Sequence, residues 1–295
     1  MSQTVQRCGV FLSRVVRRQS LCEEHFELTL ALEEFPPAVP GQFVQVLCRR
    51  PDDAEGGAAM LRRPFSIGGL ERGARGVEMK ILGRVVGSGT AWLDARSPGD
   101  FISVLGPLGR GFTAPPRGAT ALLIAGGIGL PPIRWMAETL ANTGVLCSAI
   151  VGAQRRSLLP VTLVDDPSAT GSATNCVEEF ARAGIPAAVT TDDGSCGMRG
   201  RVTDAMAAFF GTPMARETLR VYACGPEAML RAVASLCAQQ AVECELAMER
   251  VMGCGMGTCQ SCVVPVTDSA RAEGWRYALC CTEGPVFDAR RIRWE

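Results

Sequence analysis

Three cysteines near the C-terminus have a spacing that can bind a metal cluster. Cys254, Cys259 and Cys262 follow the pattern Cys-x4-Cys-x2-Cys. With a distant fourth cysteine, this is the plant-type arrangement for a [2Fe-2S] cluster, in which a tight loop wraps three thiolates around two irons. Gly255 and Gly257 suit such a loop, because a residue without Cβ adopts positive φ and lets its N–H approach a sulfide.

The spacing alone leaves the fourth ligand open. Cys280 and Cys281 both lie at a suitable distance downstream, and only one of them can bind. Because the chain has 14 cysteines in 295 residues, a four-cysteine zinc site and a coincidental spacing are the competing interpretations. Three cysteines at these offsets are rare by chance at that frequency, which favours the cluster.

The composition narrows the class of function. Thirty acidic residues balance 30 basic ones, which argues against nucleic acid or a polybasic membrane surface as partner. Neither a membrane-spanning apolar run nor a signal-peptide pattern occurs, so we expect a cytoplasmic protein without membrane contact. The cysteines outside the motif are expected to be buried hydrophobes and not disulfides. The single histidine, His25, has no nucleophile-triad context and is expected to be an ordinary surface or strand residue.

Short alternating strands dominate the first part of the chain. Phe26–Leu32 and Gln42–Leu47 alternate apolar and polar residues, and six or more such segments predict an antiparallel β-barrel over residues 1–114. One segment combines the groups that bind the phosphate and pack the ring of a flavin nucleotide. A plain strand with a solvated arginine is the alternative. The residues are Arg63, Pro64, Phe65 and Ser66.

A glycine-rich loop, Gly83–Thr90, follows and leads into a short predicted helix at 91–94. Backbone N–H groups at a helix start attract pyrophosphate, and a simple β-turn is the alternative. The preceding flavin-type motif favours phosphate binding.

The periodicity changes after a predicted linker at Pro115–Gly118. Ala119–Ala125 is a continuous apolar run, typical of a buried parallel strand, and a glycine loop joins it to a helix reaching about Asn142. The loop departs from the Rossmann fingerprint because prolines follow its third glycine, but a phosphate-binding loop remains the prediction. Its glycines are Gly126, Gly127 and Gly129.

Alternating strands and helices predict a doubly wound α/β sheet over residues 115–241. Further strands are expected at 145–151, 186–190 and 218–223, and helices near 174–183, 202–210 and 226–240. Ligands bind such sheets at the carboxyl ends of the strands, where the loops Thr191–Ser195 and Cys224–Glu227 lie. We take Cys224 as the catalytic candidate, with its sulfur facing a nicotinamide ring and with Gly225 and Pro226 as cofactor contacts. A buried structural cysteine is the alternative.

Residues 242–295 form a predicted third unit. The strand Val242–Met248 leads through Glu249 and Arg250 into the cysteine loop. A unit of about fifty residues has too small a hydrophobic core to be stable without an additional cross-link, and a metal cluster would provide that cross-link.

Together the motifs resemble the electron-transfer subunit of the NAD-dependent class B dihydroorotate dehydrogenases, a branch of the ferredoxin-NADP reductase superfamily. The resemblance runs nearly end to end. It rests, in chain order, on Arg63–Ile67, Gly87–Thr90, Gly106–Phe112, Gly126–Gly129, Thr191–Ser195, Cys224–Pro226, Glu249–Cys262 and Gly284–Phe287.

The resemblance implies site residues that spacing left open. Family members place the fourth cluster ligand three residues before Gly284–Phe287, which selects Cys281. FAD contacts are implied at Arg63–Ser66, at Leu82, Gly83 and Arg84, and at Gly89 with Thr90. Gly83 stands where relatives often have a tyrosine, so Phe65 is expected to cover that part of the flavin.

The resemblance also implies a route for electrons. A separate FMN-containing catalytic subunit oxidises dihydroorotate to orotate in pyrimidine biosynthesis. This chain then passes the electrons through the [2Fe-2S] cluster and FAD to NAD, a diffusible substrate. The expected assembly is a heterotetramer of two plus two subunits. Arg155–Arg156 could form a 2′-phosphate pocket, and NAD is favoured over NADP by the resemblance.

Two other functions compete. The first is a sister subunit, an FAD/[2Fe-2S] NAD(P)H reductase serving a ferredoxin-dependent transhydrogenase, a hydrogenase or a sulfite reductase. The second belongs to a different class, a non-catalytic cysteine-rich scaffold that binds structural zinc.

Overall fold

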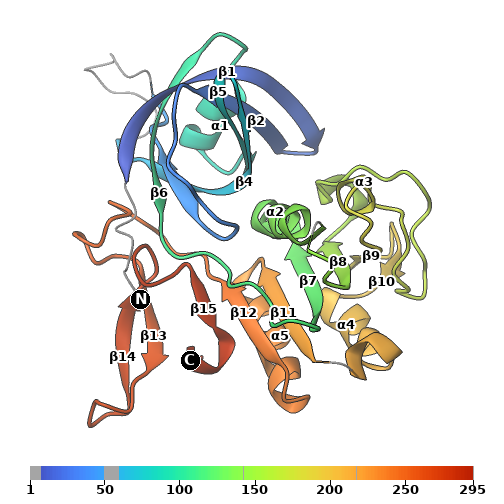
Figure 1. The fold of residues 1–295 in the computed structure, drawn as a ribbon. Helices are drawn as coiled ribbons and strands as arrows, with labels where there is room; N and C mark the ends of the chain where they lie inside the picture. The colour runs from blue at the N-terminus through green and yellow to red at the C-terminus, as the bar shows by residue number, and fades with distance from the viewer. Residues whose placement is uncertain (1–7, 50–59, 142, 217, 295) are drawn as a thin grey trace.

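The computed structural model describes residues 8–49, 60–141, 143–216 and 218–294. A β-barrel lies beside an α/β sheet, and a C-terminal hairpin extends beyond one edge of that sheet (Figure 1). Among the described helices, none combines the length and apolar character that crossing a bilayer requires.

The N-terminal part is a closed barrel of six antiparallel strands in the order β1-β2-β5-β4-β3-β6. Alternation places one side of each strand inside, where Phe26, Leu28 and Leu30 of β2 are fully buried. This confirms the predicted barrel. Its elements are β1 (Gly9–Cys22), β2 (His25–Leu32), β3 (Phe43–Val46), β4 (Arg63–Gly73), β5 (Gly76–Arg84), the short helix α1 (Ser88–Asp94) and β6 (Phe101–Leu108).

The second part is a seven-stranded sheet in the order β10-β9-β8-β7-β11-β12-β15. All pairs are parallel except β12 with β15. Its strands are β7 (Thr120–Gly126), β8 (Cys147–Ala153), β9 (Ala187–Thr191), β10 (Met198–Arg199), β11 (Leu219–Cys224), β12 (Glu243–Ala247) and β15 (Val286–Asp288).

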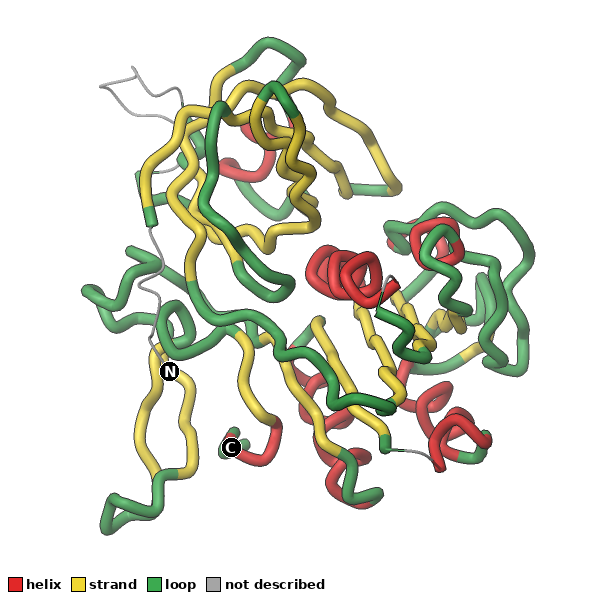
Figure 2. The backbone as a smooth tube through the Cα atoms, in the orientation of Figure 1, coloured by secondary structure: helices red, strands yellow, loops and turns green. Residues whose placement is uncertain are grey.

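Helices cover both faces of this sheet, as the apolar run in β7 predicted. Leu122 and Ile124 share a core with α4 (Val202–Phe210) and α5 (Glu227–Gln239). Leu123 packs instead in the core that includes α2 (Leu130–Ala141). Since neighbouring residues of a strand point to opposite faces, β7 is buried on both. Figure 2 shows α2 between the sheet and the barrel, with the other two helices beyond the sheet.

The helix expected near 174–183 is shorter than predicted. Only α3 (Glu178–Ala181) is helical, because the backbone of the preceding segment forms hydrogen bonds with strand β9 and not within a helix. Thr174 exchanges two of them with Ala187 at the start of β9, at 3.0 and 2.7 Å. This bridge holds residue 174 extended and delays the helix.

The predicted third unit does not have a sheet of its own beyond a hairpin. Strands β13 (Val263–Thr267) and β14 (Trp275–Leu279) pair only with each other in the two-stranded sheet, whereas β12 and β15 belong to the seven-stranded sheet. The division at residue 242 therefore crosses a continuous sheet, and the three ranges remain a proposal about domains.

Candidate functional site

A cleft of about 460 Å³ opens at the carboxyl ends of the parallel strands. Gly126 ends β7, Gly152 belongs to β8 and Thr190 to β9, and all three line it. Parallel strands present their ligand-binding loops at this edge, as the sequence predicted for the sheet. The cleft also contains the predicted residues Gly127 and Pro226.

The glycine loop and the Cys224 loop meet beside the cleft, whose lining includes Gly127 and Pro226 but not Gly129, Cys224 or Gly225. A Cβ on Gly129 would lie 2.2 Å from the carbonyl oxygen of Cys224. The loop forms a single 3₁₀ turn, Gly127–Gly129, that passes directly into α2. Glycine is therefore required at position 129, because only a residue without a side chain permits this approach of two backbones.

Cys224 ends β11 opposite Ala125 of β7 and Ala247 of β12. Burial raises the pKa of its thiol to about 12. The sulfur is therefore protonated at neutral pH and can pack against a ligand only as a neutral group. Gly225 is buried beside it, where a Cβ would lie 2.5 Å from Cε of Met229.

Barrel residues complete the cleft, and one of them was not among the predicted site residues. Arg84, an expected FAD contact, lines the cleft together with His25. His25 is buried, and its Nδ1 lies 2.7 Å from the carbonyl oxygen of Glu23. It is a strand residue, one of the two expected alternatives, and it also lines the cleft. Its place at the start of β2, paired with Arg84, could have been found only from the strand register.

Arg155 forms an ion pair with Glu23, which lies between β1 and β2 of the barrel. Its guanidinium binds both carboxylate oxygens of Glu23 at 3.0–3.1 Å, and Ser157 donates to the same carboxylate at 2.6 Å. The Ser157 hydroxyl and then Arg155 lower the pKa of Glu23. Arg155, one of the two arginines considered for a 2′-phosphate pocket, is therefore already paired with a carboxylate.

The cysteine loop is shaped by backbone turns and N–H···S contacts. Gly255 and Gly257 have φ of +76° and +89°. These turns direct the backbone N–H groups of Met256 and Cys259 to Sγ of Cys254, each at 3.4 Å. Left-handed conformations of this kind favour glycine, as predicted for the loop.

The fourth position distinguishes the two candidate cysteines. The backbone N–H of Cys281 donates to Sγ of Cys262 at 3.4 Å, and its own thiol interacts with Cys262 and with Cys254. Cys280 points elsewhere, because its thiol donates to the carbonyl oxygen of Met248 at 3.4 Å and is fully buried. The structure therefore brings Cys281, and not Cys280, against Cys262 of the cysteine loop, which favours Cys281 as the fourth ligand.

The donor set fits a [2Fe-2S] cluster. Each of two irons takes two of the four thiolates, so the sulfurs need not converge on one point. Within the described ranges, no three His, Cys, Asp or Glu side chains are placed to hold a single metal ion. A tetrahedral zinc site, in contrast, brings four ligands to one ion.

Ser261 supports the exposed end of this loop. Its hydroxyl lies 3.2 Å from Sγ of Cys259 and accepts from the N–H of Gly253 at 3.2 Å. The hydrogen bond from Ser261 lowers the pKa of Cys259 to about 6, with a smaller contribution from Cys254. This favours the thiolate that an iron ligand must be.

The expected FAD residues lie on the barrel strands β4 and β5 and on α1. Arg63 is exposed and donates to the carbonyl oxygens of Leu61 and Arg62, so its charge is available to a phosphate. Phe65 is 8% exposed and belongs to the barrel core, while Pro64 and Ser66 are half-buried. An arginine that is free of carboxylates in the described residues fits a nucleotide phosphate.

The other FAD candidates differ in exposure. Leu82 is buried in the core shared with the sheet. The Thr90 hydroxyl accepts from the N–H groups of Val86 and Gly87, at 2.9 and 3.2 Å, and so shapes the loop itself. Gly89 is buried in the first turn of α1.

The space beside Gly83 is filled by a side chain of the neighbouring strand. It pairs with Phe26 across β2 and β5, and a Cβ there would lie 2.5 Å from Cζ of the Phe26 ring. A tyrosine at position 83 would need that space, so Phe26 explains why glycine occurs here. Phe65 was the residue predicted to compensate, and the contact between Phe26 and Gly83 was not among the predictions.

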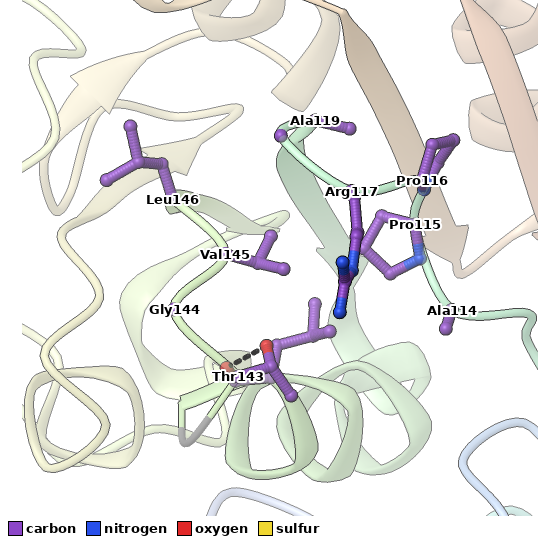
Figure 3. Close-up of a pocket in the computed structure, with 11 residues that line it drawn as sticks. Ala114, Pro115, Pro116, Arg117, Ala119, Thr143, Gly144, Val145 and Leu146 are labelled. Atoms are coloured by element: carbon purple, nitrogen blue, oxygen red, sulfur yellow. Dashed lines mark hydrogen bonds between the residues drawn. The ribbon is translucent and has the colours of Figure 1, made fainter.

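A second cavity, of about 450 Å³, lies at the opposite ends of the strands. It is bounded by the linker Ala114–Ala119 and by the loop Thr143–Leu146, with Arg117 extending between them (Figure 3). Arg117 is the one charged residue among its described lining residues. The cavity is separated from the cleft by the length of the sheet and none of the predicted site residues lines it.

Comparisons with known proteins agree with this architecture. Residues 123–235 match the family model described as an oxidoreductase NAD-binding domain, and residues 249–293 match the iron-sulfur cluster binding domain of dihydroorotate dehydrogenase B. The solved NADH-dependent reduced ferredoxin-NADP oxidoreductase, studied for flavin-based electron bifurcation, is similar with a TM-score of 0.74 and 25% identity, over 97% of this chain and 91% of that one. The fold and site thus define an NAD-linked iron–sulfur flavoprotein of the ferredoxin reductase type.

Curated relatives narrow the family. The electron transfer subunit of dihydroorotate dehydrogenase B (NAD(+)) from Desulforamulus reducens is 36% identical over 88% of both chains. The protein of the same name from Bacillus caldolyticus is 38% identical over 94% of this chain and 96% of its own length. The chain belongs to the family of dihydroorotate dehydrogenase B electron transfer subunits, and the resemblance drawn from its motifs is confirmed.

Proposed function

We propose that this chain is the electron-transfer subunit of an NAD-dependent dihydroorotate dehydrogenase in pyrimidine biosynthesis. It accepts electrons from a partner FMN-containing subunit, which oxidises dihydroorotate to orotate, and delivers them to NAD. When bound, the [2Fe-2S] cluster carries single electrons and FAD combines two of them for hydride transfer. The proposed assembly is a heterotetramer of two plus two subunits in the cytoplasm, a reducing compartment that suits a chain with 14 cysteines.

The observation that carries the proposal is the direct connection between the cleft and the cysteine loop. Strand β12 pairs with β11 up to Cys224, and the chain then runs through Glu249, which lines the cleft, into the loop. Arg250 fixes this passage, because its guanidinium binds both carboxylate oxygens of Glu227 at the start of α5, each at 2.9 Å. The cysteine loop is thereby held in a fixed position relative to the cleft, as the preorganisation of a functional site requires.

The chain's own residues have separate tasks in this proposal. Cys254, Cys259, Cys262 and Cys281 hold the cluster, and the loop N–H groups orient their sulfurs. On the barrel, Arg63–Ser66, Leu82–Arg84, Gly89 and Thr90 hold FAD. On the sheet, Gly126, Gly127, Gly129, Gly225 and Pro226 bind NAD, and Cys224 packs against its nicotinamide.

NAD is the proposed acceptor and not NADP. The guanidinium of Arg155 is held by Glu23, so it is not free to pair with a 2′-phosphate. Steady-state kinetics with both nucleotides test this point, and equal efficiency with NADP would contradict it.

Reconstitution tests the proposed function. The chain, loaded with iron, sulfide and FAD, is mixed with a dihydroorotate-oxidising FMN subunit, and NADH formation is followed at 340 nm. We expect dihydroorotate-dependent NAD reduction only when both subunits are present. Failure to accelerate NAD reduction, with both subunits fully loaded, would reject the proposal.

The sister-subunit function is tested in the same experiment. Its support is the 25% identical bifurcating oxidoreductase, which shares the fold over nearly the whole chain. Reduction of ferredoxin by NADH without any response to dihydroorotate would favour this second function. A colourless protein that contains zinc would exclude both electron-transfer functions and would favour the cysteine-rich scaffold that binds structural zinc.

A further inference from the structure

Gln45 is a buried polar residue for which the protein provides no partner. It lies in the middle of β3 and is fully buried, with 0% of its surface exposed. Neither Oε1 nor Nε2 has a hydrogen-bond partner in the described part of the chain. Buried amides are almost always paired, so this one indicates a group that binds there.

Strand alternation shows which side of the barrel the Gln45 side chain occupies. Val44 and Val46 belong to the core inside the barrel. Phe43 belongs instead to the core that contains Cys262 and Cys281. Because side chains two residues apart share a face, Gln45 points with Phe43 out of the barrel and toward the cluster-binding segment.

The amide of Gln45 rests directly on the cysteine loop. A Cβ on Gly255 would lie 2.6 Å from Cγ and 2.8 Å from Nε2 of Gln45. Gly255 follows the proposed ligand Cys254, and its φ of +76° turns the loop at that point. Glycine at position 255 thus serves two purposes, the turn and the approach of the glutamine.

Gln45 also adjoins strand β4, which carries the proposed FAD residues Arg63–Ser66. Gln45 pairs with Pro64 across β3 and β4, within the segment Arg63–Ser66. Its backbone carbonyl accepts a hydrogen bond from Arg62 at 3.3 Å, which fixes the strand but leaves the side-chain amide free. Gln45 therefore stands between the two proposed cofactors.

We propose that Gln45 is a positioning residue for the [2Fe-2S] cluster and that its side-chain N–H donates a hydrogen bond to a cluster sulfur on the Cys254 side of the loop. Reduction places an additional negative charge on the cluster, and a donor stabilises that charge. Gln45 thereby raises the reduction potential of the cluster. This inference rests on the cluster-binding part of the proposed function.

The test compares Gln45→Met with the wild-type chain, both loaded with iron, sulfide and FAD. Methionine keeps the length and burial of glutamine but has no N–H donor. The cluster is titrated with a reductant and followed by its EPR signal. We expect the equilibrium constant for its one-electron reduction to fall about tenfold, which equals a decrease of about 59 mV in midpoint potential.

Gln42→Met is the matched control. Gln42 is also a buried glutamine beside β3, but its amide is satisfied within the barrel region, accepting from Val39 N–H at 3.0 Å and donating to the Gly109 carbonyl at 2.7 Å. Its replacement should lower thermal stability and leave the cluster potential unchanged. A purely structural role for Gln45 would make the two variants behave alike.

A measurement on the wild-type chain covers the case in which Gln45→Met fails to retain its cluster. The protein is labelled with ¹⁵N in the side-chain amide of glutamine, and pulsed EPR of the reduced cluster should detect coupling to one ¹⁵N nucleus. Absence of that coupling overturns the inference. An unchanged cluster potential in Gln45→Met also overturns the inference. If the flavin potential shifts instead, the amide is assigned to FAD. If neither potential shifts, the amide is assigned to a buried water.

Failure of the proposed function can be distinguished from failure of the Gln45 inference. A wild-type chain that binds the cluster but does not respond to dihydroorotate contradicts the function and leaves the Gln45 experiment valid. A chain without iron contradicts both.

Discussion

At the scale of single residues, the four-cysteine site is decided by where two adjacent thiols point. Cys280 and Cys281 follow β14 in sequence, and their side chains diverge. The thiol of Cys280 is bound to the carbonyl of Met248, while Cys281 joins Cys262. A neighbour that is already hydrogen-bonded and fully buried cannot substitute for the ligand without rearrangement of the core.

This geometry predicts opposite outcomes for two serine variants. Cys281→Ser should lose most of its iron and its visible iron–sulfur absorbance, because a serine oxygen is a poor replacement for thiolate at iron. Cys280→Ser should keep both, since its hydroxyl can still donate to Met248. Iron content and absorbance of the purified variants provide the measurement, and the reverse pattern would show that Cys280 is the ligand.

Cys224 allows a prediction about pH. Burial raises the pKa of its thiol to about 12, so the group stays protonated below that pH and contributes no ionisation between pH 6 and 9. Cys224→Ala should retain FAD and slow its reduction by NADH about tenfold, by the same factor across this range. Stopped-flow flavin bleaching measures the rate. Unchanged rates would make Cys224 structural, and a pH-dependent ratio would contradict a neutral thiol.

At the scale of elements, the strand–glycine–helix unit determines how closely a cofactor can approach the sheet. Strand β7 ends at Gly126 and passes through one 3₁₀ turn into α2, so the helix starts against the end of β11. The prolines that follow Gly129 occupy the first turn of α2, where a missing N–H costs nothing. This is how the unit tolerates a sequence that departs from the Rossmann fingerprint.

Two glycines of this unit should respond differently to alanine. Gly129→Ala places a methyl 2.2 Å from the carbonyl oxygen of Cys224 and should lower the free energy of unfolding by about 1–3 kcal/mol, with weaker NADH binding. Gly127→Ala meets no atom within 4 Å and pays only for its φ of +50°, about 1 kcal/mol. Urea unfolding and NADH titration compare them, and a Gly127 variant at least as damaged as the Gly129 variant would contradict this account.

At the scale of the whole molecule, the barrel and the sheet are held together by ion pairs as well as by packing. Arg134 of α2 lies 2.6 Å from Glu27 of β2, and both side chains are nearly buried. Arg134 also donates to the carbonyl of Gly68 on β4 at 3.3 Å. Arg155 and Glu23 form a second, exposed pair across the same junction. The buried pair dominates, because exposed pairs contribute little.

Breaking the buried pair should therefore destabilise the junction. Arg134→Met leaves Glu27 as an uncompensated charge and should cost about 3–5 kcal/mol of unfolding free energy. The double variant Arg134→Met with Glu27→Leu should recover most of that loss, because neither charge remains. Urea unfolding measures both. Equal stability of the single and double variants would mean that Arg134 acts through its packing and its bond to Gly68 instead of through Glu27.

Local patterns were sufficient for the fold class. Alternation in segments such as Phe26–Leu32 predicted the barrel, and the apolar run Ala119–Ala125 predicted a strand buried on both faces. The short α3 was missed because its preceding residues bond to β9, a partner distant in the chain that no local pattern reveals. The place of β12 and β15 in the central sheet was missed for the same reason.

The cysteine motif Cys254–Cys262 was determined by the sequence alone, since three proposed ligands within nine residues are fixed by the chain between them. The tertiary structure decided what surrounds it: which of Cys280 and Cys281 faces the loop, that Phe26 fills the space above Gly83, and that Gln45 lies against Gly255. These contacts join residues from different strands. Their energies depend on burial and direction, which arise only when the barrel, the sheet and the loop pack together.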